Sequence, residues 1–267
     1  MKQAKIGPWI AIAIGTLYFV VPLIGTFEFS LRMRRGQYSF DAYRVVLDDP
    51  RFQATFGYST VLALATIVVG VLLVVPTAYW VQLRLPRLRP VVEFITLLPL
   101  VIPAIVIVFG YLRIYGSSSL LPMTTNERAT DVLLMFSYVM LSLPYMYRAV
   151  DTGIRAIDVA TLTEAAESLG ARWPTILFKV ILPNVRSAVL SGAFLTFATV
   201  IGEFTMTSLL DRPAFGPYLQ LMGQDRAYEP SALAIISFAI TWACLGLMQL
   251  LGRPVEKSSA ATIVEAK

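Results

Sequence analysis

The segment TEAAESLGARWPTILFKVILP, residues 163–183, is a polar and broken stretch within an apolar chain. It contains two Glu, one Arg and one Lys, with Pro174 and Pro183 inside it, and long apolar runs precede and follow it. Of the 267 residues, 57% are hydrophobic and only 15% are charged, whereas globular domains hold about 25% charged residues. The charges are concentrated in short segments, so the fold is decided by the apolar runs between them.

Outside this segment the chain divides into apolar runs of the length needed to cross a membrane. A transmembrane helix needs about 20 predominantly apolar residues, and the short run 132–147 is extended by Arg148, whose long side chain can reach the interface. A soluble helical protein would show polar faces on such helices, and these runs show almost none. The sequence therefore predicts an all-α polytopic membrane protein with one transmembrane domain over residues 1–267. The six predicted spans are about 8–29, 55–82, 91–112, 130–148, 187–210 and 230–251.

The distribution of charge predicts which side of the membrane each segment faces. Thirteen of the 22 Lys and Arg residues fall in segments 1–8, 84–90, 148–186 and 252–267, which together carry +7, whereas the remaining loops are neutral. Loops rich in Lys and Arg face the cytoplasm, so both termini and the loop 149–186 are predicted to be cytoplasmic. The basic residues have no interleaved aromatic residues and no soluble domain to sit on, so nucleic-acid binding is not expected.

The residue types also limit the chemistry. The chain has no His, and its one Cys, Cys244, lies within the last predicted span. Because His is the commonest metal ligand and general base, we expect no metal site and no catalytic residues, and a membrane-embedded metalloprotease or oxidoreductase is disfavoured. The motif G-x-x-x-x-G-K-[ST] is absent, so the chain cannot bind ATP in a P-loop of its own, and no cofactor is expected on it.

Two prolines lie four residues apart in the third predicted span, in LLPLVIPAIV (97–106). Pro99 and Pro103 each remove a backbone hydrogen bond, so this helix is predicted to kink or unwind. Membrane proteins tolerate such a break where neighbouring helices or a cavity satisfy the freed carbonyl groups. Two interpretations stay open, a packing kink and a hinge that lines a solute path.

The cytoplasmic loop 149–186 is predicted to form two short helices joined at Gly170. Thr161 and Glu164 have the spacing of a capping box, which places Glu164 in the first turn of the first helix. Gly170 follows the last apolar position, where a left-handed residue often ends a helix, and Pro174 fits the first turn of the second helix. One stripe of mostly small apolar residues, which a partner could approach closely, comprises Leu162, Ala165, Ala166 and Leu169.

The same loop resembles a motif of the permease subunits of ATP-binding-cassette importers. That motif reads E-A-A, three residues, G, nine residues, I, one residue and L-P, and this chain departs from it only at Val180, where the motif has Ile. The match spans 20 residues and lies between the fourth and fifth predicted spans on the predicted cytoplasmic side, as it does in the family. The matching residues are Glu164, Ala165, Ala166, Gly170, Val180, Leu182 and Pro183.

The resemblance implies a division of labour between several proteins. In the family this loop docks in a groove of a separate ATPase and transmits nucleotide-driven closure to the pore, so the chain itself would not be an enzyme. The implied partners are an ATPase dimer that binds ATP and Mg, a second permease subunit, identical or homologous, and a periplasmic solute-binding protein. The implied location is a bacterial inner membrane, with lipids around the spans. The alternative, a helix lying on the bilayer, is disfavoured by the acidic Glu164 and Glu167, which anionic lipids would repel.

A carboxylate, Glu203, lies near the outer end of the fifth predicted span, in GEFTMTSLL (202–210). A charge there is costly unless it faces protein or a water-filled cavity. It is therefore a candidate acceptor for a cationic solute or a gate residue, or else it makes an interhelical hydrogen bond or a pair with Arg113. Nearby hydroxyl groups, and two tyrosines that an aromatic belt would also explain, complete the candidate path: Thr205, Thr207, Tyr138 and Tyr145.

The solute is indicated only by the resemblance to one branch of the family. The length, the motif spacing and the GEFTMTSLL run look most like the branch of the family that imports polyamines such as spermidine and putrescine. The same branch includes permeases for aminoalkylphosphonates, thiamine and ferric iron, and these stay open. A secondary transporter is a more distant alternative. It would need ion sites with broken helices in two matched halves, and the prolines of the third span offer only one half.

Overall fold

The computed structural model describes residues 6–119 and 121–252, and these form an all-helical fold, as predicted. The first half contains α1 (Ile6–Ser30), α2 (Asp41–Leu47), α3 (Pro50–Leu83), the short turn η1 (Pro86–Leu88), α4 (Arg89–Val101), α5 (Ala104–Tyr115) and α6 (Glu127–Arg155). The second half contains α7 (Val159–Ser168), α8 (Trp173–Thr175), the π-helical η2 (Ile176–Ile181), α9 (Leu182–Asn184), α10 (Arg186–Ile201), α11 (Thr205–Leu209), α12 (Phe215–Asp225) and α13 (Glu229–Gly252). Most of the two terminal segments predicted to be cytoplasmic lies outside the described residues.

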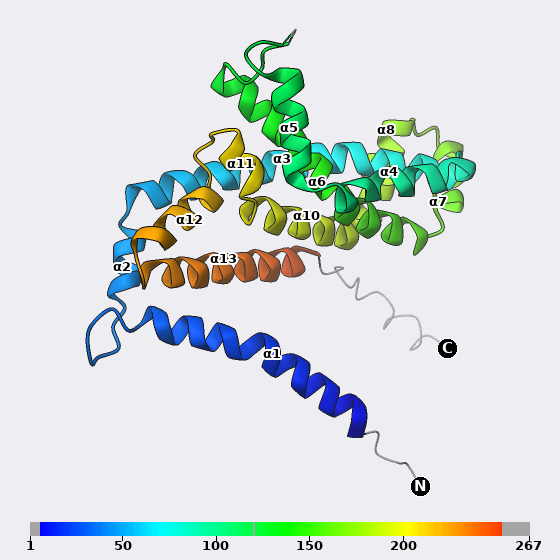
Figure 1. Ribbon diagram of the computed structural model, residues 1–267. Helices are drawn as coiled ribbons and strands as arrows, with labels where there is room; N and C mark the ends of the chain where they lie inside the picture. Colours follow the sequence, from blue (N-terminus) through cyan, green and yellow to red (C-terminus); the bar gives the residue numbers. More distant parts are fainter. Residues whose placement is uncertain (1–5, 120, 253–267) are drawn as a thin grey trace.

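The core of the molecule is a bundle of α3, α6 and α10, which pack against one another. α13 packs on α10 and also against α1, which stands apart from the bundle in Figure 1. Two clusters of buried side chains fill the bundle. One surrounds Leu134, Tyr138 and Met206, and the other surrounds Met146 and Ile181.

Three of the described helices are long and apolar enough to cross a membrane on their own: Gly7–Ser30, Pro50–Leu83 and Glu127–Arg155. Two bent pairs, α4 with α5 and residues 173–184 with α10, bring the number to five if each pair is one span. The apolar stretch Glu229–Cys244 of α13 is shorter. The multi-pass helical architecture is confirmed, whereas the count of six spans and the cytoplasmic termini stay predictions.

The helices differ from the predicted spans and loops in three places. α6 continues to Arg155, so the loop predicted to begin at 149 starts inside a helix. α10 ends at Ile201 and does not continue to 210. Glu203 lies in the non-helical break that follows it. The outer loop that follows contains α12, and its first residue, Phe215, is buried against aromatic rings of α3.

The third predicted span is broken, as its prolines predict. α4 ends at Val101, Ile102 has an extended backbone and α5 begins after Pro103, with a bend of 96° between the two helices. Pro99 lies inside α4 without ending it. The break therefore belongs to Pro103, because a proline disfavours helical backbone at the residue before it. The kink is confirmed, and a hinge role for it stays a prediction.

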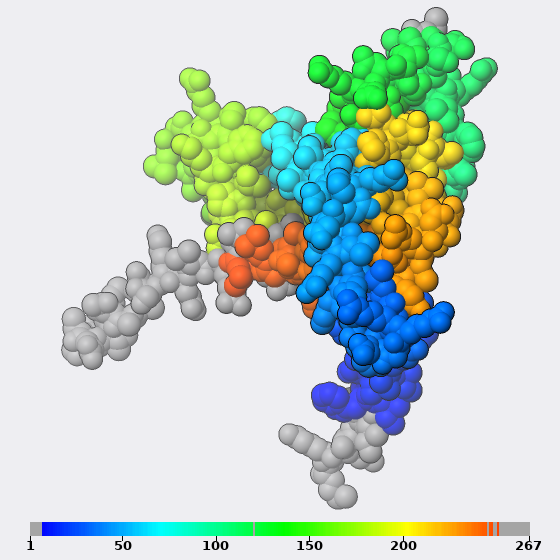
Figure 2. Space-filling view, turned by 90° about the vertical axis from the view of Figure 1, so that its left-hand side faces the viewer, coloured from blue at the N-terminus to red at the C-terminus, as the bar shows by residue number. Residues whose placement is uncertain are grey.

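Figure 1 places α2 and α12 at one end of the bundle and α7 and α8 at the other. We call these the outer end and the inner end, following the predicted topology. In Figure 2 the residues around α7 and α8, coloured yellow-green, form a lobe that projects from the body. Polar contacts tie elements together at the outer end: Arg212 Nε donates to Asp131 at 2.7 Å, and the hydroxyl of Tyr218 donates to Asp49 at 2.8 Å.

Candidate functional site

The inner segment, residues 159–183, begins with α7, which starts earlier than the capping-box spacing predicts. Its N-cap is Asp158, whose carboxylate accepts hydrogen bonds from the hydroxyl of Thr161 at 2.7 Å and from its amide at 3.2 Å. These bonds hold the pKa of Asp158 below its ordinary value. The predicted capping box is therefore wrong: Asp158 takes the capping role, and Glu164 lies in the second turn with an exposed side chain.

α7 ends at Gly170 in the left-handed conformation that the sequence predicts. Gly170 has φ of 79°. The amide of Ala171 donates to the carbonyl of Ala166 at 3.0 Å, and the amide of Gly170 donates to that of Glu167 at 2.8 Å. This pair of bonds is the Schellman motif, which closes a helix on a left-handed residue. Since a side chain there costs about 1–2 kcal/mol, glycine fixes how the chain leaves α7.

The second half of the inner segment is helical but irregular. η2 is a π-helical turn, and a bend of 80° separates this half from α10, next to the joint that Pro183 predicts. Ile176, Leu177 and Ile181 are at most 1% exposed and pack among side chains of α3 and α6. The remaining motif residues of this half lie at its edge: Val180 and Leu182 are half-buried and Pro183 is exposed.

Further contacts attach the inner segment to the end of α3. The hydroxyl of Tyr79 lies 3.2 Å from the hydroxyl of Thr163 inside the interface. The rings of Trp80 and Trp173 stack with their centroids 5.0 Å apart. Together with the buried side chains of η2, these contacts make the inner segment a rigid extension of α3 and α6.

The face of α7 turned away from the bundle carries exposed apolar surface. Leu169 is 88% exposed, and Ala165 is exposed as well. The predicted stripe therefore divides into two faces, since Ala166 is buried and Leu162 is half-buried. The fully buried side of the helix comprises Val159, Thr163 and Ala166.

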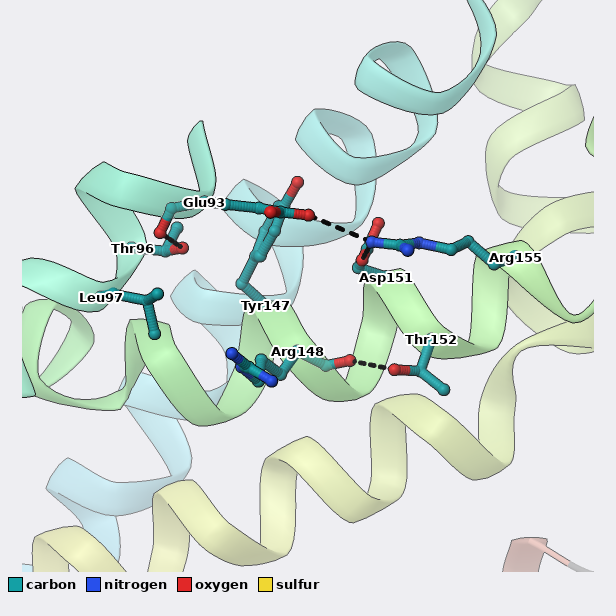
Figure 3. A pocket seen from close by; sticks show the side chains of 8 residues that line it. All are labelled: Glu93, Thr96, Leu97, Tyr147, Arg148, Asp151, Thr152 and Arg155. Atoms are coloured by element: carbon teal, nitrogen blue, oxygen red, sulfur yellow. Dashed lines mark hydrogen bonds and ion pairs between the residues drawn. The ribbon is translucent and has the colours of Figure 1, made fainter. Parts of the chain in front are cut away.

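A second group of polar residues, which the sequence analysis did not bring together, lies at the inner end between α4 and α6 (Figure 3). Arg89 lies 2.9 Å from Glu93 on its own helix and 3.5 Å from Asp151 on α6. Arg155 lies 3.1 Å from Glu93 and also pairs with Asp151. An isolated exposed pair adds about 1 kcal/mol or less. Here each charge contacts two opposite charges, and we call the four residues the α4–α6 ion cluster.

At the outer end, Glu203 occupies the break between α10 and α11. Its carboxylate accepts hydrogen bonds from the amides of Met206 at 2.7 Å and Thr207 at 3.2 Å, and from the hydroxyl of Tyr138 at 3.1 Å. The amide bonds cap α11, and the bond from Tyr138 on α6 is the interhelical alternative considered above. A pair with Arg113 is not among the ion pairs of the described residues.

The candidate path residues do not all gather around this carboxylate. Tyr138 and Thr207, which bond to Glu203, are 1% and 0% exposed and so are enclosed by protein. Thr205 is half-buried at the start of α11, whereas Tyr145 is 37% exposed on α6. A solute-path role for these residues stays a prediction.

Known proteins match this chain over most of its length. A family described as "Binding-protein-dependent transport system inner membrane component" matches residues 75–254. The chain belongs to this family. The matched range contains α6, the inner segment and α10, so the relationship indicated by the E-A-A motif is confirmed.

Individual relatives are permeases of ABC transporters. This chain is 32% identical over 195 residues to a "Probable molybdenum ABC transporter permease protein" of Haloferax volcanii, and the match covers 68% of this chain and 70% of that one. It is 29% identical over 203 residues to the molybdenum permease ModB of Mycobacterium tuberculosis, covering 73% and 76%. It is 28% identical over 134 residues to the spermidine/putrescine permease PotC of Escherichia coli, covering 49% and 50%.

The fold of the permease matches solved importers. A bacterial ABC transporter that imports alginate superposes with a TM-score of 0.70 at 14% identity, covering 94% of this chain and 95% of that one. The protein is therefore a permease subunit of an ABC importer and not an enzyme, since ATP hydrolysis belongs to a separate subunit. The polyamine branch is not favoured, because the two molybdenum permeases match more of the chain than PotC does.

Proposed function

We propose that the inner segment docks in a groove of a separate ABC ATPase and is the point where nucleotide-driven movement enters the permease. The observation that carries this proposal is Leu169, a large apolar side chain that is 88% exposed at the end of α7. Exposed apolar surface on a projection favours contact with another protein, and an amphipathic helix suits a groove. Glu164 and Glu167 lie on the exposed side, where Glu167 pairs with Arg84 at 3.8 Å and Glu164 offers its charge to a basic rim of the groove.

The contacts that anchor the inner segment support a role in transmitting movement to the helix bundle. Ile176 and Ile181 lock η2 against α3 and α6, and the Schellman closure at Gly170 fixes the exit from α7. A pull on the exposed face would therefore move α3 and α6 with it. ATP binding shifts the permease between inward-open and outward-open states only if the closed ATPases hold the segment differently from the open ones.

The proposed assembly contains two permeases, two ATPase subunits that bind ATP and Mg, and a periplasmic solute-binding protein, in a bacterial inner membrane. A solved alginate importer that resembles this fold, with a TM-score of 0.69 at 17% identity, is bound to a periplasmic protein. One permease supplies half of the solute path. Apolar side chains on α4 and α5, such as Phe94, Val101 and Phe109, are more than half exposed and leave surface for the second permease or lipid.

We propose a molybdenum-containing anion as the first candidate solute and a polyamine as the second. The first rests on the relatives named for molybdenum transport, which cover about two thirds or more of the chain. The second rests on PotC and on Glu203, a carboxylate suited to a cation. The bonds that Glu203 accepts from Tyr138, Met206 and Thr207 weaken the second candidate, because little acceptor capacity is left for a solute.

The docking proposal is tested by Gly170→Val with Gly36→Val as the matched control. Both glycines have positive φ, 79° and 75°, and both have open space where a Cβ would be built, so the two changes strain the chain alike. Only the first lies in the inner segment. In proteoliposomes with the cognate ATPase and binding protein, we expect Gly170→Val to abolish solute-stimulated ATP hydrolysis and Gly36→Val to preserve it. Normal stimulation in the Gly170 variant would reject the docking role.

The solute proposal is tested on the cognate solute-binding protein. Thermal unfolding of that protein is measured with molybdate, with spermidine and with sulfate as a control anion. A stabilisation by molybdate alone supports the first candidate, and stabilisation by spermidine alone supports the second. If neither solute raises the unfolding temperature, both candidates are wrong. Uptake of the stabilising solute by the reconstituted importer then links the result to this chain.

A further inference from the structure

On α4, the α4–α6 ion cluster has an order of charges that helix formation alone does not favour. Arg89 precedes Glu93 on α4, and Asp151 precedes Arg155 on α6, so each charge meets an opposite one within its helix and another across the interface. Arg89 is also the first residue of α4, where a positive charge opposes the helix dipole. Its placement is therefore stabilised by its carboxylate partners and not by its own helix.

The cluster provides many of the contacts that hold α4 against the rest of the protein. Among the described elements, α4 packs chiefly against α6. It buries only Thr96 and Pro99 fully; Val92 is half-buried, and several large apolar side chains, such as Phe94, are exposed. With so little buried apolar surface, the position of α4 on α6 depends on the ion pairs across the interface.

The cluster also lies between the inner segment and the bent span. Arg155 ends α6, and the N-cap of α7, Asp158, follows after two residues. On the other side α4 leads through the 96° bend into α5. α5 in turn packs against α11, the short helix that Glu203 caps. A continuous series of elements, joined either by packing or directly along the chain, thus runs from α7 to the Glu203 break.

We propose that the α4–α6 ion cluster is a positioning device that makes α4 follow α6, so that movement of the inner segment reaches the bend at Pro103 and, through α5 and α11, the Glu203 break. This rests on the proposed docking of the inner segment, which supplies the movement. Coupling between distant sites is carried by rigid elements joined by specific contacts that have two arrangements. The four charges supply such contacts across the interface between α4 and α6.

A cavity beside the cluster gives the charges room for a second arrangement. It has a volume of about 380 Å³, and Figure 3 shows Glu93, Tyr147 and Arg155 around it. Tyr147 is 2% exposed, and in the part of the chain that the structure describes its hydroxyl has no hydrogen-bond partner. A buried unpaired donor is costly. A shift of Glu93 or Asp151 during movement of α6 would give this hydroxyl an acceptor.

The test exchanges the charges of one helix at a time. The α4 variant combines Arg89→Glu with Glu93→Arg, and the α6 variant combines Asp151→Arg with Arg155→Glu. Each keeps the net charge and the pair within its own helix, but it makes both cross-helix pairs like-charged. The variant with all four changes restores every opposite-charge pair. The measurement is solute transported per ATP hydrolysed in proteoliposomes, together with binding of the ATPase to the permease.

We expect each two-residue variant to bind the ATPase normally while the transport per ATP falls by about tenfold. The four-residue variant should recover most of it. Parental transport per ATP in both two-residue variants would overturn the proposal, and so would a four-residue variant that stays defective while folded. ATPase binding separates the two proposals. If the parental permease does not bind the ATPase, the proposed docking function is wrong. If it binds the ATPase but transport per ATP does not change in the two-residue variants, only the proposed role of the cluster is wrong.

A milder pair of variants covers the case in which the exchanged charges prevent folding. Glu93→Gln and Asp151→Asn keep the shape of each side chain and remove its charge. We expect transport per ATP to fall by about threefold for each, with unchanged elution of the purified permease in detergent. Unchanged transport per ATP in both would reject the positioning role.

Discussion

The inner segment and the Glu203 break are both places where the chain leaves a regular helix, but they treat their polar groups in opposite ways. At the break, the half-buried Glu203 carboxylate accepts bonds from two amides and from Tyr138, beside a cluster of buried side chains. In the inner segment the backbone ends are closed by Asp158 and Gly170. The carboxylate of Glu164, however, makes no hydrogen bond or ion pair in the described part of the chain, and Leu169 is exposed.

This difference indicates that the Glu203 break supports the fold from within, whereas the exposed face of the inner segment is suited to contact a partner. A closed network inside a protein stiffens it, and removing one member leaves buried polar groups without partners. An exposed apolar side chain, or an exposed carboxylate such as that of Glu164, contributes little to the stability of the chain that carries it. Substitutions at the break should therefore change the stability of the permease, whereas outward substitutions in the inner segment should change its binding to another protein.

The largest expected effect lies within the inner segment, between its two faces. Ile176→Ala removes a side chain that is 1% exposed and should lower the free energy of unfolding by about 2–5 kcal/mol. Leu169→Ala removes one that is 88% exposed and should leave unfolding unchanged while weakening ATPase binding. Thermal unfolding in detergent and a pull-down with the ATPase measure the two effects. Equal stability losses in both variants would contradict the two-faced description.

The next effect tests how tightly the outer end is packed around the break. A Cβ on Gly216 would lie 2.3 Å from the carbonyl oxygen of Glu203, whereas Gly223 on the same helix has nothing within 4 Å of that position. Gly216→Ala should therefore destabilise the permease by about 1–3 kcal/mol. Gly223→Ala should be neutral or stabilising by less than about 1 kcal/mol. The comparison uses one helix and one substitution, and similar unfolding temperatures would show that α12 is free to shift.

A smaller effect compares the carboxylates of the two regions. Glu203→Gln replaces one acceptor oxygen with a donor that faces the capped amides, and it should cost about 0.5–2 kcal/mol. Glu164→Gln should leave stability unchanged, because that side chain is exposed and unpaired among the described residues. Both are measured by thermal unfolding. If Glu203 also binds a cationic solute, Glu203→Gln should reduce transport of the cation more than its stability loss explains. Transport equal to that of the parental permease would reject a role for Glu203 in the solute path.

Most of the features that short stretches of sequence determine agree with the structure, although the count of six spans stays a prediction. The apolar runs gave the membrane helices, because crossing a membrane is a matter of length and hydropathy within one segment. Pro103 gave the bend and Gly170 gave the left-handed closure, since each acts on the backbone within a few residues. The capping error is also local, because Asp158 lies three positions before Thr161 and competes for the same role.

Features that depend on distant segments could not be predicted in this way. α12 lies between the last two predicted spans, where no helix was predicted, and its Phe215 packs against Phe52 and Phe56 of α3, far away in the sequence. The spacing of Arg89 and Glu93 was visible, but their partners on α6 follow only from how the helices pack. Glu203 was correctly expected to need a protein or solute partner, and only the fold shows its bond to Tyr138.

The smallest expected effect concerns the N-cap of α7, which keeps the exposed face of the inner segment helical. Asp158→Ala removes the acceptor for Thr161 and should raise the hydrogen-exchange rate of the first amides of α7. Asp158→Asn should stay close to the parental rate, because Asn caps helices about as well as Asp. The two variants thus separate the hydrogen bond from the charge.

The pH dependence of this cap follows from the direction of its pKa shift. The pKa of Asp158 in the folded protein lies below its ordinary value of 3.8, because Thr161 bonds to the ionised carboxylate. The capping contribution is therefore complete above pH 3.8 and is lost only as the pH falls through the lower folded value. Exchange in α7, corrected for intrinsic rates, should stay constant from neutral pH down to that range and then rise in the parental permease but not in Asp158→Asn. A rise that begins near neutral pH would mean that another group holds the N-terminus of α7.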